Sequence, residues 1–320
     1  MKNALALALL VALAVSISSV DAQRVHRVGV LNTGFASPGI FSPLGTSFEK
    51  RLADLGYRQG QNLVLERRWA EGKLDRLPAL TAELAQLNVE VIVTIGNKIQ
   101  KIVQDANPRI PMVSLSCDSF SSVASYARPN GNFTGVTCMS TELSPKRLEL
   151  AKQLVPGASR AVYLHNPTQG DVGLALTLQA ASRLGVAIKP VEARSGAELK
   201  AAFAAIAAER PDVLLVYPDA LTMTQRDAIT AFAAAQKLPA VYAYKEFAEA
   251  GGLISYGSTL TELGERSADL VVKILRGTKP SDLPLEQATR VYLTVNLKTA
   301  RALGYNVPQS ILQRADYVIR

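Results

Sequence analysis

Residues 89–116, VEVIVTIGNKIQKIVQDANPRIPMVSLS, decide the fold. Two short apolar runs within this stretch, 89–94 and 111–116, have the length and composition of buried strands. Residues 98–107 lie between them and have the pattern of a helix. Because the helix connects two strands, we expect the strands to pair in parallel in one sheet and the helix to cover a face of that sheet.

The same alternation continues on both sides of this unit. Further strands are expected at 27–31, 63–69, 134–138, 160–164, 187–191, 213–217 and 240–243. Further helices are expected at 43–55, 75–87, 144–155, 172–184, 197–209 and 221–236, with one more that begins after Thr259. The pattern predicts an α/β fold of two doubly wound, Rossmann-like lobes. No nucleotide-binding fingerprint is present, so the predicted ligand site is the cleft between the lobes, beyond the carboxyl ends of the strands.

The first 22 residues have the parts of a signal peptide. Lys2 supplies a positive start, 5–15 is an apolar run, and Val20-Asp21-Ala22 places small residues at a cleavage site. A membrane anchor is the alternative, but this run is too short to cross about 30 Å of hydrocarbon. We therefore expect export to a bacterial periplasm and a mature chain that begins at Gln23.

The composition is that of a globular, basic protein. Hydrophobic residues make up 48% of the 320 residues, which is enough for two domains, and the net charge is +8. Lysine and arginine are scattered rather than interleaved with aromatic residues, which gives no support to nucleic-acid binding. The positive charge instead favours an anionic ligand or partner surface.

Small polar residues follow several expected strands, where a ligand in the cleft would bind. These candidate ligand-binding residues are Asn32, Thr33, Gly34, Gly96, Asn97, Lys98, Asp118, Ser119, Asn166 and Asp219. Backbone N–H groups at the start of a helix attract a carboxylate or phosphate, and Lys98 adds a full positive charge. The hypothesis is that all these loops meet in one cleft.

Each candidate also has a purely structural explanation. Asp219 suits the N-cap of the helix that follows it. Lys98 fits an ordinary solvated lysine, and Asn32 and Asn166 suit the tight turns after their strands. No single residue decides between the two explanations.

Several motifs resemble one protein family over essentially the whole mature chain. They are RRWAEG at 67–72, RPNGNFTG at 128–135, VYPD at 216–219, LPAVY at 238–242, GGLISYG at 251–257 and NLKTARALG at 296–304. The chain resembles the solute-binding proteins of a bacterial ABC-transporter family that is labelled tryptophan/tyrosine transport. The GGLISYG run and the helix after it are the most specific part of the match.

The resemblance implies a type I periplasmic binding protein, in which the chain crosses between two lobes three times. Lobe 1 is then expected to hold 23–140 plus 251–279, and lobe 2 to hold 141–250 plus 280–320, after the signal peptide 1–22. The protein is expected to be a monomer without catalytic activity or a cofactor. Its expected partners are a small-molecule ligand and an ABC permease in the inner membrane.

The chain departs from the family pattern at two proposed ligand loops. Gly96-Asn97-Lys98 stands where the family has Gly-Thr-Pro or Gly-Ser-Pro, and Asp118-Ser119 stands where an Asp-Pro pair is common. A lysine in place of proline adds a charge and a backbone N–H, so an anionic group would be held differently here. Tyr244 and Tyr256 are candidates for stacking on an aromatic ligand, or for packing within the fold.

Cys117 and Cys138 end two expected strands that lie side by side in this architecture. An oxidising compartment permits a disulfide between them, and two buried thiols are the alternative. The sequence leaves both open, because a disulfide requires Cα atoms within about 7 Å.

An exported enzyme and a sensor subunit are the rival functions. Ser47 and Lys50 form a Ser-x-x-Lys pair, but the companion motifs of acyl enzymes are absent from the sequence. The only histidines, His26 and His165, give no metal site at a usable spacing. A sensor would bind its ligand in the same way, so the sequence does not separate sensing from transport.

Overall fold

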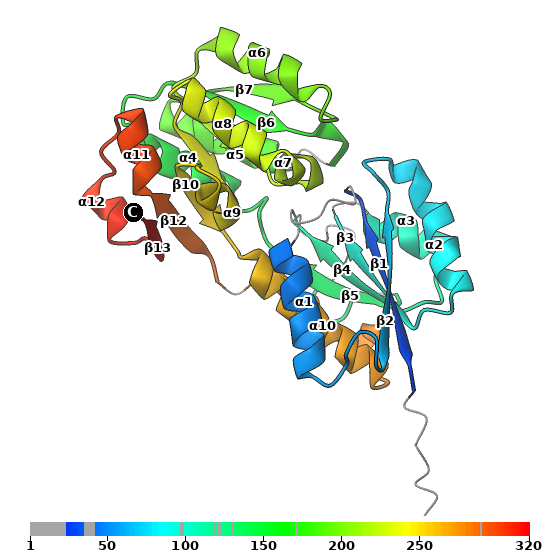
Figure 1. The fold of residues 1–320 in the computed structure, drawn as a ribbon. Coiled ribbons are helices and arrows are strands. Elements are labelled where there is room, and N and C mark those ends of the chain that lie inside the picture. The colour runs from blue at the N-terminus through cyan, green and yellow to red at the C-terminus, as the bar shows by residue number, and fades with distance from the viewer. Residues whose placement is uncertain are drawn as a thin grey trace, which may run out of the picture.

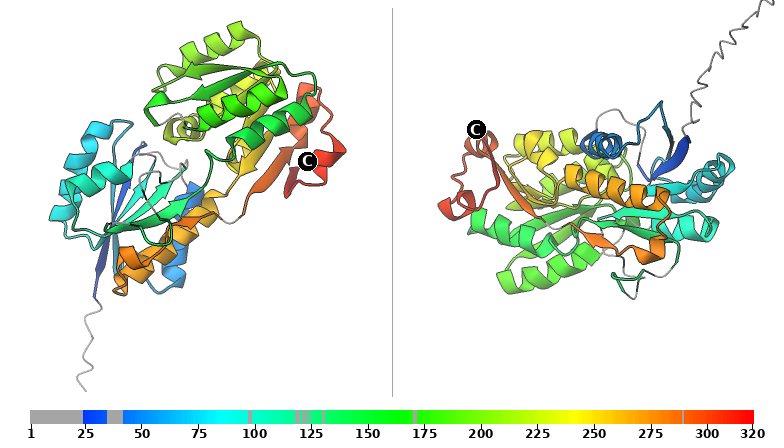
Figure 2. Two further views of the ribbon diagram at one scale, coloured as in Figure 1. Left: turned by 180° about the vertical axis from the view of Figure 1, so that it is seen from behind. Right: turned by 90° about the horizontal axis from the view of Figure 1, so that it is seen from below.

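The computed structural model describes residues 24–34, 42–96, 99–117, 120, 123, 125–129, 131–169, 172–288 and 290–320. These residues form two sheets with helices packed on both faces, which build two lobes (Figure 1, Figure 2). The predicted two-lobed α/β fold is therefore confirmed. The predicted signal peptide lies outside the described residues, and no helix within them is long and apolar enough to cross a membrane.

Sheet A, the sheet of lobe 1, is parallel in all its described pairings. Its strands lie in the order β11 (Glu286–Gln287), β5 (Phe133–Thr137), β4 (Met112–Ser116), β3 (Val91–Ile95), β1 (His26–Asn32) and β2 (Leu63–Trp69). Its helices are α2 (Leu77–Gln86) and α3 (Ile99–Ala106) on one face, and α1 (Ser42–Asp54) and α10 (Leu260–Leu275) on the other (Figure 1). Alternate strand residues divide between the faces: Ile92 belongs to the core with α2 and α3, whereas Val91 and Val93 belong to the core with α1 and α10.

Sheet B, the sheet of lobe 2, contains one antiparallel pairing among its described strands. The order is β13 (Tyr317–Ile319), β12 (Tyr292–Asn296), β10 (Ile254–Gly257), β9 (Ala240–Tyr242), β8 (Val213–Val216), β6 (Arg160–His165) and β7 (Ala187–Glu192). The β10–β12 pair is antiparallel. Alternate residues again face opposite cores: Tyr163 and Leu215 pack in one apolar cluster, and Val162 and Leu214 pack in another.

The helices of lobe 2 divide between the two faces of sheet B. The face of Tyr163 is covered by α4 (Ser144–Leu154), α5 (Val172–Leu184), α11 (Leu297–Leu303) and α12 (Gln309–Leu312). The face of Val162 is covered by α6 (Leu199–Glu209), α7 (Ala220–Thr224), α8 (Arg226–Ala235) and α9 (Lys245–Glu249). Short 3₁₀ turns complete the described elements: η1 (Leu74–Arg76), η2 (Pro167–Gln169) and η3 (Pro280–Asp282). The single helix expected at 221–236 is two helices, which meet at Gln225.

Two strands lie in the opposite sheet from the one given by the expected lobe boundaries. Residues 251–279 were expected in lobe 1, but β10 pairs with β9 and β12 in sheet B. Residues 280–320 were expected in lobe 2, but β11 pairs with β5 in sheet A. The chain therefore changes lobe after β10 and again after β11, because backbone pairing partners rather than chain length decide where a strand lies.

The described elements are joined across the lobes at three places, and a buried arginine bonds to residues at or next to two of them. The connections run from β5 to α4, from β10 to α10 and from β11 to β12. Arg147 of α4 donates to the Ser140 carbonyl at 2.9 Å, to Ser140 Oγ at 2.6 Å and to the Tyr256 carbonyl at 2.9 Å. Its guanidinium therefore links the first connection to the end of β10, next to the second.

Candidate functional site

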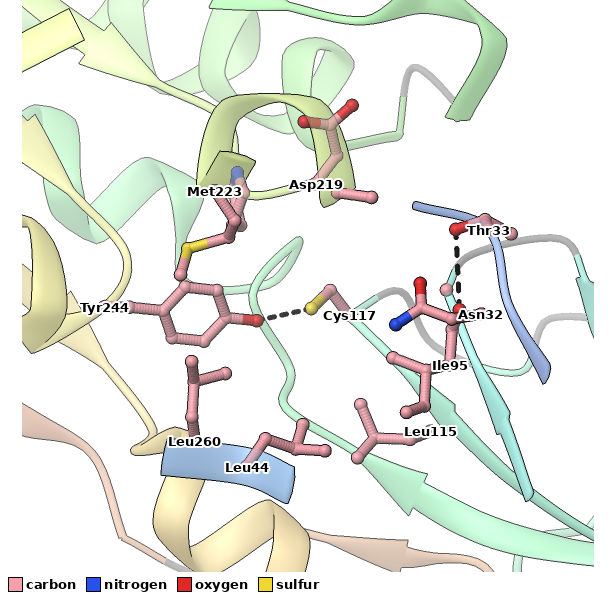
Figure 3. Close-up of a pocket in the computed structure, with 13 residues that line it drawn as sticks. Asn32, Thr33, Leu44, Ile95, Leu115, Cys117, Asp219, Met223, Tyr244 and Leu260 are labelled. Carbon is pink, nitrogen blue, oxygen red and sulfur yellow. Dashed lines mark hydrogen bonds between the residues drawn. The ribbon is translucent and has the colours of Figure 1, made fainter. Parts of the chain in front are cut away.

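Loops from the carboxyl ends of both sheets meet around a cavity between the lobes (Figure 3). This inner cavity has a volume of about 460 Å³, including the part open to solvent. Its lining residues are Asn32, Thr33, Leu44, Ile95, Gly96, Leu115, Cys117, Pro218, Asp219, Ala220, Met223, Tyr244 and Leu260. Its position, beyond the carboxyl ends of the strands, is the one predicted for a doubly wound fold.

A second cavity adjoins the first and shares Thr33, Asp219 and Ala220 with it. This outer cavity has a volume of about 600 Å³, again including space open to solvent. It is lined by Thr33, Gly34, Glu71, Gly72, Lys73, Asn166, Arg194, Ser195, Asp219, Ala220 and Leu221. The inner cavity is mainly apolar, whereas the outer one carries charged side chains from both lobes.

Asp219 stands where the two cavities join and has two roles. It is the N-cap of α7: Oδ1 accepts from the Thr222 N–H at 2.7 Å, and the Asp219 N–H donates to Thr222 Oγ1 at 3.0 Å. The other carboxylate oxygen, Oδ2, is buried and has no hydrogen-bond partner among the described residues. The capping role predicted as the structural explanation of Asp219 is therefore seen, and it uses only one of the two carboxylate oxygens.

Burial changes the chemistry of this carboxyl group. The side chain of Asp219 is almost inaccessible to solvent, and this burial raises its pKa to about 6 even though interactions with Thr222, with the Asn166 side chain and with the Leu221 backbone lower it. A buried carboxylate oxygen without a hydrogen-bond partner is costly, so a cation or hydrogen-bond donor placed next to Oδ2 would stabilise the ionised form.

Lobe 1 contributes a loop that is held rigidly at the end of β1. Asn32 Oδ1 accepts from the Gly34 N–H at 2.7 Å, so Asn32 does shape a tight turn. Thr33 donates from its backbone N–H to the Ile95 carbonyl at 3.1 Å and accepts at its carbonyl from Gly72 at 2.7 Å. The Asn32 carboxamide is turned toward the middle of the inner cavity (Figure 3).

Gly96 is required at the point where the end of β3 passes Thr33. Its φ is +135°, a conformation that side chains rarely adopt, and an added Cβ would collide with the Thr33 side chain. Gly96 therefore brings two cavity-lining loops closer together than any other residue would allow.

The remaining wall of the inner cavity is apolar. Leu44, Ile95 and Leu115 come from lobe 1, Met223 comes from α7, and Leu260 starts α10 (Figure 3). Tyr244 of lobe 2 completes the wall, and burial raises the pKa of its hydroxyl well above the usual value, so it stays protonated. This surface suits the hydrophobic part of a ligand.

The structure brings together most of the predicted site residues that it describes. Asn32, Thr33, Gly96, Asp219 and Tyr244 line the inner cavity, and Gly34 and Asn166 line the outer one. Asn166 also shapes a turn, because its Oδ1 accepts from the Thr168 N–H at 3.1 Å. The other predicted residues, Asn97, Lys98, Asp118 and Ser119, lie outside the described part of the chain.

Tyr256 lies apart from both cavities. It packs against the core of lobe 2, and its carbonyl accepts from Arg147. Of the two roles considered for Tyr256, the structure therefore places it in packing within the fold. The reason is its position in β10, where it points to the side of the sheet covered by α4.

The sequence analysis did not predict the apolar residues of the inner cavity or the basic residues of the outer cavity. Met223 is four residues after Asp219 and so lies one helical turn further along α7, a spacing that could have identified it. Cys117 lies directly after β4, the kind of position that identified the other candidate ligand residues, but the sequence analysis assigns it only a possible disulfide. Lys73 and Arg194 have no such signal, because they reach the outer cavity from loops on different lobes.

Cys117 and Cys138 carry thiols in this structure and are not joined in a disulfide. Both sulfur atoms contact the hydroxyl of Tyr244 instead, with a distance of 3.4 Å for Cys138. Within the described ranges, no group of three or more His, Cys, Asp or Glu side chains could hold a metal ion.

Comparison with known proteins gives a consistent result. The sequence profile of the family described as "ABC transporter substrate binding protein" matches residues 44–319. The tyrosine-binding protein of Clostridioides difficile is 22% identical over 262 residues, which cover 80% of this chain and 75% of that protein.

Two solved structures share the fold. A conserved domain protein from Vibrio cholerae is 24% identical, with a TM-score of 0.84 over 92% of this chain and 100% of that chain. An ABC domain from Streptococcus pneumoniae in complex with L-Trp is 22% identical, with a TM-score of 0.80 over 92% of this chain and 100% of that chain.

Proposed function

This chain belongs to the family of ABC transporter substrate-binding proteins, and on that premise we propose that it captures an amino-acid-like ligand in the periplasm for a membrane permease. Family membership makes it a solute-binding component rather than an enzyme. The identity of the solute and the compartment are our proposals, and the structure offers specific support for the first.

The observation that carries the ligand proposal is the buried, unpaired Oδ2 of Asp219 at the junction of the two cavities. A ligand ammonium group next to this oxygen would supply the missing hydrogen bond and balance the buried charge. Amino acids carry such a group, whereas sugars and simple organic acids do not.

The inner cavity would take the apolar part of the same ligand. Leu44, Leu115, Met223 and Leu260 offer hydrophobic contact on several sides, and the Tyr244 ring borders them. A flat aromatic side chain or a long aliphatic one fits this wall. The names of the relatives, a tyrosine-binding protein and a domain solved with L-Trp, point in the same direction.

An anionic group on the ligand would bind to polar side chains of lobe 1 and to the charged side chains that line the outer cavity. The Asn32 carboxamide faces the inner cavity, and Lys73 and Arg194 line the outer one from opposite lobes. Contact of one carboxylate with groups on both lobes would favour the closed cleft, because a ligand shifts the lobes only by binding the closed arrangement better. The closed form would then dock on the permease as a monomer.

Isothermal titration of the mature protein, refolded from denaturant to remove resident ligand, tests this proposal. L-Tyrosine, L-tryptophan and L-phenylalanine are the probes, with glucose and L-glutamate as comparison ligands. We expect micromolar or tighter binding of at least one aromatic amino acid. Tight binding of glucose without any amino acid would overturn the proposal of an amino-acid-like ligand. Tight binding of L-glutamate alone would overturn the apolar side chain proposed for the inner cavity.

Two analogues test the role of Asp219 separately from that of the apolar wall. 3-Phenylpropionate lacks the ammonium group and phenethylamine lacks the carboxylate, while both keep the aromatic ring. We expect removal of the ammonium to weaken binding by at least about tenfold, or ~1.4 kcal/mol. Equal affinity for L-phenylalanine and 3-phenylpropionate would exclude Asp219 as the ammonium partner.

A further inference from the structure

Cys117 and Cys138 lie opposite each other at the ends of two neighbouring strands. The last registered pair of β4 and β5 is Ser116 with Thr137, and the Cys138 N–H still donates to the Ser116 carbonyl at 3.0 Å. Paired strands are about 4.8 Å apart, and disulfides need Cα atoms about 4.4–6.8 Å apart. The backbone therefore already holds the two cysteines at a distance that permits a bridge.

The thiols also form a contact between the two lobes. Both cysteines belong to lobe 1, whereas Tyr244 follows β9 in lobe 2. Its hydroxyl contacts both sulfur atoms, and Figure 3 shows the contact with Cys117. Tyr244 and Cys117 line the inner cavity side by side. The chemical state of the thiols therefore bears on how the lobes meet beside the cavity.

A buried positive charge adjoins the pair. Arg147 donates only to neutral oxygen atoms in the described contacts, those of Ser140, Ser144 and Tyr256. Burial raises the pKa of the Cys138 thiol, but hydrogen bonds from Cys117 and Tyr244, together with the charge of Arg147, outweigh it and leave the pKa lowered. A thiolate at Cys138 is the form that attacks a sulfur atom.

We propose that Cys117 and Cys138 form a reversible disulfide that replaces their contacts with Tyr244, so that oxidation of the pair switches a contact between the lobes. The oxidant is an external disulfide on a small molecule or a protein. Cys117 is half-buried at the cavity wall, whereas Cys138 is fully buried, so Cys117 reacts first.

The exchange proceeds in two balanced steps. The Cys117 thiol loses its proton to water and its sulfur attacks the external disulfide, which releases one thiolate. The Cys138 thiolate then attacks the Cys117 sulfur of the mixed disulfide and releases the second thiolate. The pair loses two electrons and two protons, and the external disulfide is reduced to two thiols.

The bridge would remove both S–H groups from the Tyr244 hydroxyl and draw the Cys117 sulfur toward Cys138. One side of the inner cavity would then change shape, and the lobes would lose a contact next to their connections. The proposal rests on the positions of the cysteines and does not depend on which ligand the cavity takes.

Intact mass spectrometry tests whether the bridge forms. The mature protein is reduced, desalted, incubated with oxidised glutathione, then denatured and treated with N-ethylmaleimide. We expect a product without maleimide or glutathione and lighter than the reduced chain by two hydrogen atoms. A product that keeps a maleimide or a glutathione would overturn the proposal, and Cys117→Ser and Cys138→Ser should each give such a product.

The switch itself is tested by the melting temperatures of Tyr244→Phe and wild type in both oxidation states. We expect the substitution to lower the melting temperature of the reduced protein clearly and that of the oxidised protein little. Tyr242→Phe is the matched control, since Tyr242 is buried nearby and its hydroxyl has no partner among the described residues. An equal effect of Tyr244→Phe in both states would overturn the switch.

These readouts separate the proposal from the proposed function. Both mass and melting temperature are measured without ligand, so a protein that binds no amino acid can still show the bridge. Conversely, a protein that binds L-tyrosine but keeps two alkylated thiols would retain its proposed function and lose the switch.

Discussion

Asp219 and Thr222 form a reciprocal pair of side chain to backbone hydrogen bonds at the start of α7. Asp219 Oδ1 accepts from the Thr222 N–H at 2.7 Å, and Thr222 Oγ1 accepts from the Asp219 N–H at 3.0 Å. This pair orients the carboxylate and leaves Oδ2 unpaired at the junction of the cavities. The cap and the candidate binding role therefore depend on different oxygen atoms of one side chain.

Asp219→Asn should separate the two roles. The amide oxygen can still cap α7, so we expect a melting temperature close to that of wild type, whereas the affinity for an aromatic amino acid should fall at least about tenfold because the charge is lost. Thr222→Ala is the control: it removes the hydroxyl that accepts from the Asp219 N–H and donates to the Tyr217 carbonyl, so it should cost at least about 1 kcal/mol of stability, with a smaller effect on affinity because the carboxylate charge stays. Calorimetry and thermal melting measure both quantities.

Ligand affinity should depend on pH through Asp219. Burial raises the pKa of this carboxyl to about 6, so ligand-free Asp219 is ionised above that pH and protonated below it. Because an ammonium group binds the ionised form, titration from above pH 6 to well below it should weaken binding. Asp219→Asn should abolish this dependence, and an unchanged pH profile in that variant would assign the effect to another group.

The stability of the ligand-free protein should change with pH in the opposite sense. The folded-state pKa of about 6 is above the ordinary value of 3.8, so folding favours protonated Asp219. This contribution, on the order of 3 kcal/mol, is fully present below about pH 4 and is lost as the pH rises through about 6. The measurement is the denaturant midpoint of wild type and of Asp219→Asn at several pH values across this range. The difference between the two proteins gives the contribution of Asp219.

Gly96→Ala should distort the inner cavity. The alanine would need a φ near +135° and would collide with Thr33, so we expect a loss of about 1–3 kcal/mol and weaker ligand binding. Gly45→Ala is the matched control, because Gly45 lies within α1 and an added Cβ there meets no atom within 4 Å. That control should be neutral or stabilising by up to about 1 kcal/mol.

Arg147→Met should be strongly destabilising. It removes the donor for Ser140 Oγ and for the carbonyls of Ser140 and Tyr256, and each buried acceptor left unsatisfied costs about 1–3 kcal/mol. The Ser140 carbonyl keeps the Ser144 hydroxyl as a donor at 3.1 Å. Arg51→Met is the comparison: its ion pair with Asp269 is exposed, so its loss should change stability much less than the loss of Arg147. Similar denaturant midpoints for the two variants would show that Arg147 does not clamp the connections.

Much of the fold was predictable because its signals are local. Strands such as β3 and β4 are short apolar runs buried on both faces, and helices such as α5 start and end at the expected residues. The loops at the carboxyl ends of the strands were identified for the same reason, since Asn32 ends β1 and Asp219 caps the helix that follows β8.

The rest of the site needed contacts between distant segments. Leu44 and Leu260 line the inner cavity from helices α1 and α10, which are far apart in the sequence, and nothing in either segment marks the residue as a ligand contact. The sequence gives no reason to prefer Tyr244 over Tyr256 as a ligand contact. Only Tyr244 lines the cavity, because the two side chains pack in the cores on opposite faces of sheet B.

The sequence by itself determined the alternation of strands and helices, the two-lobed α/β class and the loops that bear polar residues, because hydrophobic periodicity and capping act over a few neighbouring residues. Only the tertiary structure decided that β10 belongs to sheet B and β11 to sheet A, and that Cys117 and Cys138 of one lobe meet Tyr244 of the other. Strand pairing and contact between lobes depend on backbone and side-chain partners that lie far apart along the chain, and no local pattern records them.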